Sequence, residues 1–334
     1  MQSRTISSGI GILNVNPNEG GFLLAYYAGV DIGGTKIAVG IGRETGDILG
    51  EGRLMTSEFT DGDKGLDAIA GEIKELCDKL GISMDSLSRI GVGSPGPLDG
   101  GKLLKTANLP TWEGVDLSAG LKLRTGRPTA VENDATAAAI GEWQFGAGKG
   151  LQHFVYVTVS TGVGSGIVVN GSRYAGIQGN AGEIGHMVMK PQGSVCRCGR
   201  RGCLETLASG TAIQQRAMER AESSPYLKTM ATIEAQDVFA GAVKGDLTCQ
   251  SIIREASQYL GLGLSYLVNL FNPQALILGG GVMVNQPEWL NIIIPFVAEY
   301  SMADLFQPVN IALAQLGTDS GLLGAIATAV TSQI

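Results

Sequence analysis

The chain has few charged residues and no long apolar run. Charged side chains make up 16% of its 334 residues, against 44% for apolar ones. This composition is typical of a well-packed globular protein and excludes a disordered one. No apolar run approaches the roughly 18 residues that a helix needs to cross a bilayer. No low-complexity tract or linker is present, and the length predicts two domains, each with its own core.

The chain also lacks an excess of positive charge. Its net charge of −7 argues against nucleic acid or an anionic membrane as a partner. Any anionic ligand must therefore be bound by local backbone amides. The chain has 50 glycines, about twice the average share, which predicts many tight turns and close backbone contacts.

Cysteine is scarce, and its placement excludes a disulfide framework. Two of the five cysteines, Cys77 and Cys249, lie in helical-looking segments and are predicted to be core residues. Without a disulfide framework, the chain is expected in a reducing compartment, the cytoplasm.

The other three cysteines follow one of only two histidines. His186 precedes Cys196, Cys198 and Cys203, in the string AGEIGHM…CRCGRRGC. One nitrogen and three thiol ligands fit a tetrahedral structural zinc site. The Cys-x-Cys spacing is tighter than the usual two to four residues or so, and the alternative is a set of reduced surface thiols.

Residues 1–26 are predicted to be a loose leader. Their apolar stretches are short and interrupted by Asn, Pro, Glu and Gly, which makes a poor signal peptide.

Regular structure is expected from Tyr27, where a strand, a glycine turn and a second strand follow one another. Periodicity then predicts a helix over 65–80 and a strand over 89–96. Residues 98–130, punctuated by glycine and proline, are expected to be loop-rich. A helix should begin after Asn133-Asp134, one of which would cap it, and run to about Trp143.

The second half repeats this opening, with a strand–glycine turn–strand pattern over 154–171. Helices are expected over 210–222, 232–244 and 248–271, a buried strand leading into a glycine turn over 275–282, and a helix in the tail. The pattern predicts two α/β lobes related by an internal duplication. We assign 27–130 to the first lobe, completed by the tail helix at 318–334, and 131–317 to the second, with a zinc-binding loop at 186–203.

Three glycine turns at strand ends predict a nucleotide site. The amides of such turns bind anions, and Asp31 ahead of the first turn could hold a hydrated magnesium ion. Each turn alone could be an ordinary hairpin. The candidate nucleotide-binding residues are Asp31, Gly33, Gly34, Thr35, Lys36, Thr161, Gly162, Gly279 and Gly280.

Two familiar nucleotide motifs do not apply. Gly91-x-Gly93-x-x-Gly96 matches the dinucleotide pattern, but Pro95 and Pro97 lie where that motif needs a helix to begin. Around Gly29–Lys36 the order Gly-Thr-Lys, followed by a strand, excludes a P-loop.

Glu132-Asn133-Asp134 is the best catalytic candidate. Asp134 could accept a substrate hydroxyl proton while Asn133 binds a neighbouring hydroxyl, which suits phosphoryl transfer. Asp134 could instead be a plain helix cap. Glu183, His186 and Glu205 could support the zinc loop or bind a polyol.

Together these strings resemble the ROK family (repressors, open reading frames, sugar kinases). The resemblance covers nearly all of residues 27–330. It is carried by DIGGTK at 31–36, GSPGPLD at 93–99, ENDATAAAIGE at 132–142, STGVGSG at 160–166, AGEIGHM at 181–187, CRCGRRGCLE at 196–205 and LGGGV at 278–282.

The resemblance implies a two-lobed actin-like ATPase (ribonuclease H-like) fold, with duplicated α/β domains around a central cleft. It implies Asp134 as general base and His186, Cys196, Cys198 and Cys203 as zinc ligands. The sugar-binding residues would be Asn108, Asn133, Asp134, Glu183, His186 and Glu205.

The implied activity is transfer of phosphate from ATP, with Mg²⁺, to a hexose hydroxyl. GEIGHM and CLETLASGTA look most like the members that convert glucose to glucose 6-phosphate. N-acetylmannosamine, N-acetylglucosamine and fructose kinases share this core, and polyphosphate is an alternative donor. Homodimers are common in the family. Family repressors carry an N-terminal DNA-binding domain, and the residues before Asp31 are neither helical nor basic, so the sequence favours the kinase over a sugar-sensing regulator.

Overall fold

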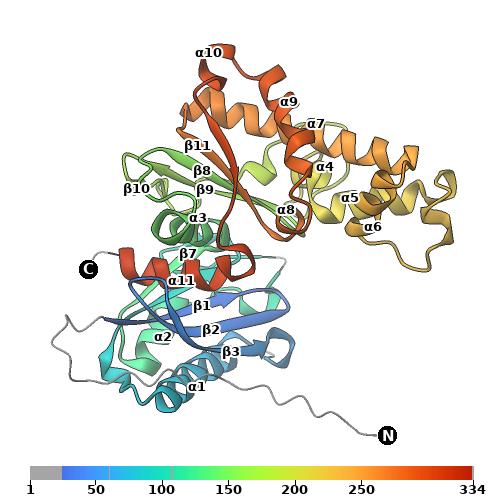
Figure 1. The fold of residues 1–334 in the computed structure, drawn as a ribbon. Coiled ribbons are helices and arrows are strands. Elements are labelled where there is room, and N and C mark those ends of the chain that lie inside the picture. Colours follow the sequence, from blue (N-terminus) through green and yellow to red (C-terminus); the bar gives the residue numbers. More distant parts are fainter. Residues whose placement is uncertain (1–24, 60, 107, 333–334) are drawn as a thin grey trace, which may run out of the picture.

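The structure, a computed structural model, describes residues 25–59, 61–106 and 108–332. The predicted leader lies outside them except for its last two residues. The chain forms two lobes, one above the other in Figure 1, and each contains a five-stranded sheet. Within the described part, no helix is both long and apolar enough for a membrane span.

The first lobe is built on a sheet with strand order β3-β2-β1-β4-β7. β1 pairs antiparallel with β2 and parallel with β4, and the outer strands β3 and β7 continue these two patterns. Helix α1 packs on β2 and β3, and α2 packs on α1 and β7. The elements are β1 (Tyr26–Ile32), β2 (Lys36–Arg43), β3 (Ile48–Met55), α1 (Gly62–Leu80), β4 (Leu87–Ser94), β5 (Leu98–Asp99), β6 (Lys102–Leu103), α2 (Leu117–Thr125) and β7 (Thr129–Asn133).

The second lobe has a sheet with order β10-β9-β8-β11-β12. Its large core lies between this sheet and the helices of the upper right of Figure 1. The elements are α3 (Asp134–Phe145), β8 (Phe154–Val159), β9 (Val163–Val169), β10 (Ser172–Arg173), α4 (Glu205–Ala208), α5 (Gly210–Glu219), α6 (Ala235–Val243), α7 (Leu247–Phe271), β11 (Ala275–Gly279), α8 (Gly281–Asn285), α9 (Trp289–Tyr300), α10 (Ala303–Phe306), β12 (Asn310–Leu313) and α11 (Ser320–Thr331).

The two sheets share one topology. β8 pairs antiparallel with β9 and parallel with β11, as β1 does with β2 and β4. In each lobe the fifth strand is followed by a helix, α3 after β7 and α11 after β12. The two-lobed, duplicated α/β architecture that the sequence predicted is therefore confirmed.

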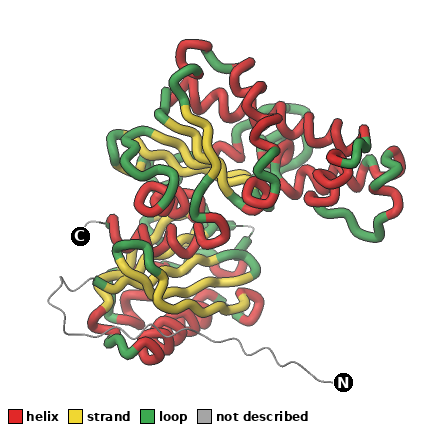
Figure 2. Tube along the Cα trace, viewed as in Figure 1, coloured by secondary structure: helices red, strands yellow, loops and turns green. Residues whose placement is uncertain are grey.

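Helices α3 and α11 form a layer between the two sheets (Figure 2). α11 packs on β1 and β4 of the first lobe, α3 packs on β8 and β9 of the second, and the two helices pack on each other. The tail helix predicted at 318–334 thus lies against the first sheet, although it follows the second lobe in the chain.

Alternating glycines allow this close packing. In β1 and β4, valines and isoleucines face α1 and form the first core, while glycines face the opposite side. A β-carbon on Gly91 would overlap the carbonyl oxygen of Ala325 in α11, and one on Gly324 would lie 2.5 Å from the carbonyl oxygen of Ala137 in α3. Part of the large glycine content therefore serves the central helix layer.

Most predicted elements are present, with two corrections. Residues 98–130 are rich in loops as expected, but they also contain the unpredicted helix α2, capped by Asp116 and ended by Gly126 at a positive φ. The first lobe extends beyond 130, because β7 continues in the first sheet to Asn133. The buried strand predicted to lead into a glycine turn over 275–282 is β11, which ends at Gly279 before Gly280 at a positive φ.

Candidate active site at the junction of the lobes

The candidate catalytic triplet lies where β7 passes into α3. Asn133 caps the helix, because its Oδ1 accepts hydrogen bonds from the amides of Ala135 (3.0 Å) and Thr136 (3.4 Å). Asp134 is the first helical residue and not the cap, so the plain-cap interpretation of Asp134 is wrong. Its Oδ1 accepts a hydrogen bond from the amide of Ala135 at 2.7 Å.

The carboxylate of Asp134 has an unusual electrostatic setting. The residue still reaches solvent, but protein surrounds it on its other sides. This desolvation raises the pKa of Asp134 to about 6, and the charges of Asp31 and Glu183 add to the effect, while the Ala135 amide opposes it. A carboxylate with a pKa close to neutral is well suited to general-base chemistry.

Asp31 ends β1 beside the first glycine turn. The turn is closed by a hydrogen bond from the Gly33 amide to the Lys36 carbonyl (2.9 Å), and Thr56 donates its hydroxyl to the Gly33 carbonyl (2.8 Å). Burial raises the pKa of Asp31, although Lys36 partly offsets this. The negative charge of Asp31 raises the pKa of Asp134. A cation between the first glycine turn and α3 would therefore reduce the repulsion between the two carboxylates.

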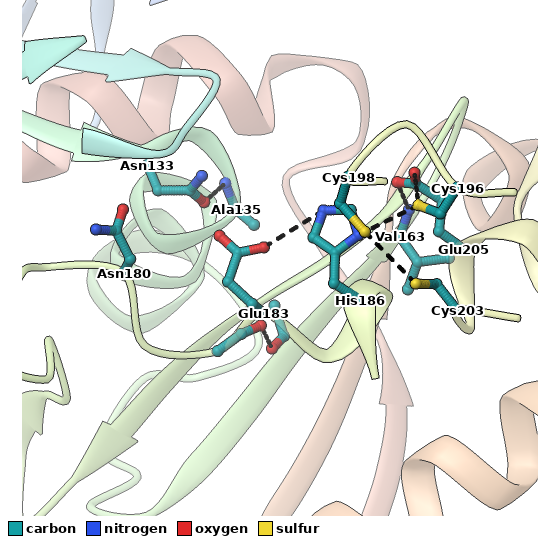
Figure 3. Close-up of polar contacts among 12 residues, drawn as sticks. Asn133, Ala135, Val163, Asn180, Glu183, His186, Cys196, Cys198, Cys203 and Glu205 are labelled. Carbon is teal, nitrogen blue, oxygen red and sulfur yellow. Dashed lines mark hydrogen bonds and ion pairs between the residues drawn. The ribbon is translucent and has the colours of Figure 1, made fainter. Parts of the chain in front are cut away.

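Asn133 and Glu183 approach each other across the lobe junction, near Gly96. A β-carbon on Gly96 would lie 3.0 Å from Nδ2 of Asn133 and 3.9 Å from Oε1 of Glu183. Because Oδ1 of Asn133 is used by the cap, its Nδ2 is the group left to donate to a ligand. Figure 3 shows Asn133 and Glu183 on one side of His186 and the cysteines on the other.

The four predicted metal ligands come together. The ligand atoms of His186, Cys196, Cys198 and Cys203 all lie within 4.8 Å of one another. Sγ of Cys196 is 3.5 Å from Nδ1 of His186, and the two remaining sulfurs are 3.6 Å apart. A tetrahedral zinc ion with Zn–S near 2.3 Å and Zn–N near 2.0 Å places its ligands roughly 3.5–3.8 Å apart. The donor set and its spacing therefore fit structural zinc.

His186 connects this cluster to Glu183. Its Nδ1 faces Cys196, and its Nε2 lies 3.8 Å from Oε2 of Glu183 (Figure 3). Burial raises the pKa of Glu183, and His186 opposes that rise. One imidazole can therefore bind a metal through one nitrogen and orient a carboxylate or a ligand hydroxyl with the other.

Glu205, at the start of α4, connects the cluster to the second glycine turn. Its Oε2 accepts a hydrogen bond from the amide of Val163 at 3.3 Å, and its Oε1 lies 3.8 Å from Sγ of Cys196. Gly162 lies so close that any β-carbon there would overlap the carboxylate. The predicted sugar-binding role of Glu205 remains a prediction.

A pocket of about 340 Å³ opens beside the second turn. Thr161 lines it, as does Gly281, whereas Gly279 and Gly280 do not. Most of its wall was not predicted, because nothing in the local sequence marks residues that come together only through α5, α6 and α8. These are Ser160, Gly210, Thr211, Gln214, Glu234, Ala235, Gln236, Phe239, Val282, Asn285 and Gln286.

Asn108 lies beside the first glycine turn. Its carbonyl oxygen would be 3.1 Å from a β-carbon on Gly34, so it borders the first glycine turn. Its role in sugar binding also remains a prediction.

Comparison with known proteins places this arrangement in a family. The chain is 34% identical over 308 residues to the glucokinase of Halalkalibacterium halodurans, which covers 90% of this chain and 93% of that protein. It is 29% identical over 300 residues to the xylose repressor of Bacillus subtilis, covering 90% of this chain and 75% of that protein.

A solved structure has the same fold. The ROK family glucokinase from Streptomyces griseus in complex with glucose and AMPPNP superimposes with a TM-score of 0.77 and 33% identity, over 92% of this chain and 100% of that chain. The sequence profile of the ROK family matches residues 27–332. The chain therefore belongs to the ROK family.

Proposed function

We propose that this protein is a sugar kinase that transfers the γ-phosphoryl group of ATP to a hexose hydroxyl, with glucose as substrate and glucose 6-phosphate as product. The observation that carries the proposal is the position of Asp134. It lies between the glycine turn that follows Asp31 and the Asn133–Glu183 pair, with its pKa raised to about 6.

Asp134 acts as the general base in this proposal. The sugar hydroxyl oxygen forms a bond to the γ-phosphorus while the bond from that phosphorus to the bridging oxygen breaks, and ADP leaves. The hydroxyl proton passes to the carboxylate of Asp134. Asn133 donates Nδ2 to a neighbouring hydroxyl, and Glu183 and His186 bind further hydroxyls, so that one oxygen is aligned for in-line attack.

Bound ions would complete the site. Mg²⁺ held beside Asp31 would neutralise developing phosphate charge, and because burial raises the pKa of Asp31, a cation there would also stabilise its ionised form. Zinc held by His186 and the three cysteines would be structural. His186 would then orient Glu183 on the sugar side, and Glu205 would orient the second glycine turn through the Val163 amide.

The pocket beside Thr161 suits the nucleotide base. Gln214, Glu234 and Gln236 supply hydrogen-bonding groups, Phe239 supplies an apolar surface, and the backbone of Gly281 leaves room for a flat ring. Its lack of a basic side chain agrees with a role in binding the uncharged end of ATP.

Asp134→Asn tests the assignment. The variant should bind glucose with unchanged affinity in calorimetry but turn over roughly 10²–10⁴ times more slowly, because an amide cannot accept the proton. The matched control is Asp116→Asn, the same change at a helix start, where either residue caps α2. More than about a tenth of wild-type turnover in Asp134→Asn would contradict the proposed role.

The choice of sugar rests on the similarity to the glucokinase, and it needs its own test. A coupled assay of ADP release over glucose, fructose, mannose, N-acetylglucosamine and N-acetylmannosamine should give the highest kcat/KM with glucose. A higher value with an N-acetylhexosamine or fructose would assign the enzyme to one of the alternative activities. Polyphosphate in place of ATP tests the donor.

A sugar-sensing regulator is the second candidate, because the chain also resembles the xylose repressor. A mobility shift assay with the DNA upstream of the chain's own gene tests it. We expect no specific shift with or without glucose. A specific shift, together with no turnover on any sugar of the panel, would favour the regulator.

A further inference from the structure

The segment that begins with β10 and ends before Glu183, residues 172–182 and here called the strap, belongs to the second lobe but contacts the first at two points. At its start, Nε of Arg173 lies 2.9 Å from Oε1 of Glu132 in the edge strand β7. Near its end, the side chain of Asn180 contacts Leu98 in β5. Between the strap and β7 lies a cavity of about 1060 Å³, so the strap crosses from lobe to lobe as a bridge.

The contact between Asn180 and Leu98 has the paired hydrogen bonds of two neighbouring strands. The amide of Leu98 donates to Oδ1 of Asn180 at 2.9 Å, and Nδ2 of Asn180 donates to the carbonyl of Leu98 at 2.7 Å. One side chain thus satisfies both backbone groups of Leu98. The Leu98 side chain is buried in the first core, so its backbone moves with the first lobe.

The strap is equally well anchored on the other side. Ser165 of β9 donates its hydroxyl to the carbonyl of Gly182, and the amide of Tyr174 donates to the carbonyl of Ile167 in β9 at 2.8 Å. Gly182 has a φ of +96°, and a β-carbon there would lie 2.7 Å from the carbonyl oxygen of Ser165. The residue before Glu183 is therefore fixed to the second lobe.

Asn180 meets the candidate sugar site at Gly96, two residues before Leu98. A β-carbon on Gly96 would lie 3.8 Å from Oδ1 of Asn180, and it would also contact Asn133 and Glu183. Figure 3 shows these three polar side chains facing the same region. A shift of Leu98 relative to Asn180 would therefore move the Gly96 loop against the two groups proposed to bind the sugar.

We propose that Asn180 is a positioning residue that couples closure of the two lobes to the alignment of Asn133 and Glu183. The inference rests on the proposed sugar kinase function. When the lobes separate, water takes over the hydrogen bonds of Asn180 and Leu98. When they close, the paired bonds re-form and bring the Gly96 loop onto the sugar-binding groups. Apparent sugar affinity then depends on the fraction of molecules in the closed state.

Removal of this contact should weaken sugar binding more than catalysis. Two neutral hydrogen bonds shift a closed–open equilibrium by roughly 10- to 30-fold. Asn180→Ala should therefore raise the glucose KM and calorimetric Kd by up to that factor, with kcat lowered less and the ATP KM within about twofold. Asn180→Asp keeps the acceptor for the Leu98 amide but opposes its carbonyl, so it should remain impaired. Asn180→Gln, which keeps both groups on a longer side chain, should restore part of the affinity.

The matched control is Gln178→Ala in the same strap. The Gln178 side chain is exposed, and its described contact with Asn180 is through its backbone carbonyl. This variant should have wild-type kinetics. A uniform loss of kcat and melting temperature in the Asn180 variants, without a selective rise in sugar KM, would indicate a merely structural role and overturn the proposal.

Hydrogen exchange at the Leu98 amide tests the contact without catalysis. In ligand-free protein, Asn180→Ala should speed exchange of the peptide that contains Leu98 by about tenfold or more relative to Gln178→Ala, and in wild type glucose should slow it further. Equal exchange in the two variants would refute the coupling even if the wild type is an active kinase. A wild type that neither binds nor phosphorylates any sugar, yet shows the faster exchange in Asn180→Ala, would instead refute the proposed function and leave the interlobe contact standing.

Discussion

Glu142 is expected to be the main polar support of the connection between the lobes. It lies in α3 and is fully buried. Its Oε2 accepts hydrogen bonds from the amides of Ala147 (2.8 Å) and Gln315 (3.2 Å), and its Oε1 accepts one from Leu316 (2.9 Å). One carboxylate thus joins the segment that follows α3 to the segment that precedes α11, where the chain passes back to the first lobe.

The size of its contribution can be worked out from these contacts. A hydrogen bond to a charged group contributes about 1.5–3 kcal/mol. Three such bonds would contribute several times that amount in a site without access to water. Residues 315 and 316 retain some access to solvent, so water can replace part of what is lost. We expect Glu142→Ala to lower the free energy of unfolding by about 2–5 kcal/mol. Glu142→Gln, which keeps one oxygen but turns an NH₂ group toward a backbone donor, should cost about 1–3 kcal/mol.

Thermal and urea unfolding measure this loss. For a chain of this size, about 2–3 °C is lost per kcal/mol, so Glu142→Ala should melt roughly 4–15 °C below wild type. Glu75→Gln is the control, because it removes a carboxylate from an exposed helix pair with Lys79 and should cost no more than about 0.5 kcal/mol. If Glu142→Gln melts within 1 °C or so of that control, the three hydrogen bonds do not stabilise the crossing as argued.

Four further predictions concern the proposed site. Because the pKa of Asp134 is raised to about 6 and the ionised form is the base, kcat/KM for the sugar should be level above that pH and fall about tenfold per unit below it. The raised pKa also means that ionised Asp134 destabilises the fold, so Asp134→Asn should raise the melting temperature more at pH 8 than at pH 5, and a loss at pH 8 would contradict this. Asp31→Ala and Thr161→Val should raise the ATP KM at least several-fold while glucose affinity, measured by calorimetry without nucleotide, changes little. A large loss of glucose affinity in either variant would contradict the assignment of the two turns to the nucleotide. Protein purified without added metal should carry about one zinc per chain, and Cys198→Ser should lower both zinc content and melting temperature and raise the glucose KM, whereas active protein with well under half an equivalent of zinc would exclude the metal.

Local patterns in the sequence predicted most of the fold. The two glycine-turned hairpins, the helix after Asn133 and the long helix at 247–271 all follow from periodicity and turn residues that neighbour one another in the chain. α2 could have been predicted, because Asp116 and Gly126 are ordinary start and stop signals. It was missed because Gly120 inside it resembled a loop glycine. In the structure a β-carbon there would overlap the Leu66 side chain, so this glycine permits close helix packing.

The contacts that join the lobes could not be predicted in this way. Asn180 and Leu98 are 82 residues apart, and Glu142 and Leu316 are 174 apart. Nothing near these residues in the sequence distinguishes them from a turn asparagine or a helical glutamate. Their roles depend on which segments the two sheets bring together. The zinc cluster is the opposite case, because its ligands lie within one loop and their residue types alone suggested the chemistry.

The duplication explains where the proposed site lies and why it is asymmetric. By strand order β8 corresponds to β1, and α11 corresponds to α3. Gly321 at the start of α11 packs against Asp31 at the end of β1, and Ala135 at the start of α3 packs against Gly164 beside the turn that follows β8. Each hairpin turn therefore faces the start of one central helix, and amides at a helix start favour negative charge.

The two helix starts differ in one respect that matters for chemistry. α3 begins with Asp134, whereas α11 begins with Ser320. Likewise Asp31, one residue before the last paired residue of β1, corresponds to Thr158 in β8. Both carboxylates thus come from the first copy of the duplicated unit, and burial together with the charge of Asp31 raises the pKa of Asp134. At the two corresponding positions the first copy carries aspartates, Asp31 and Asp134, and the second carries hydroxyls, Thr158 and Ser320. Only the first copy therefore supplies a carboxylate that could act as the proposed base and a second carboxylate that could hold a cation.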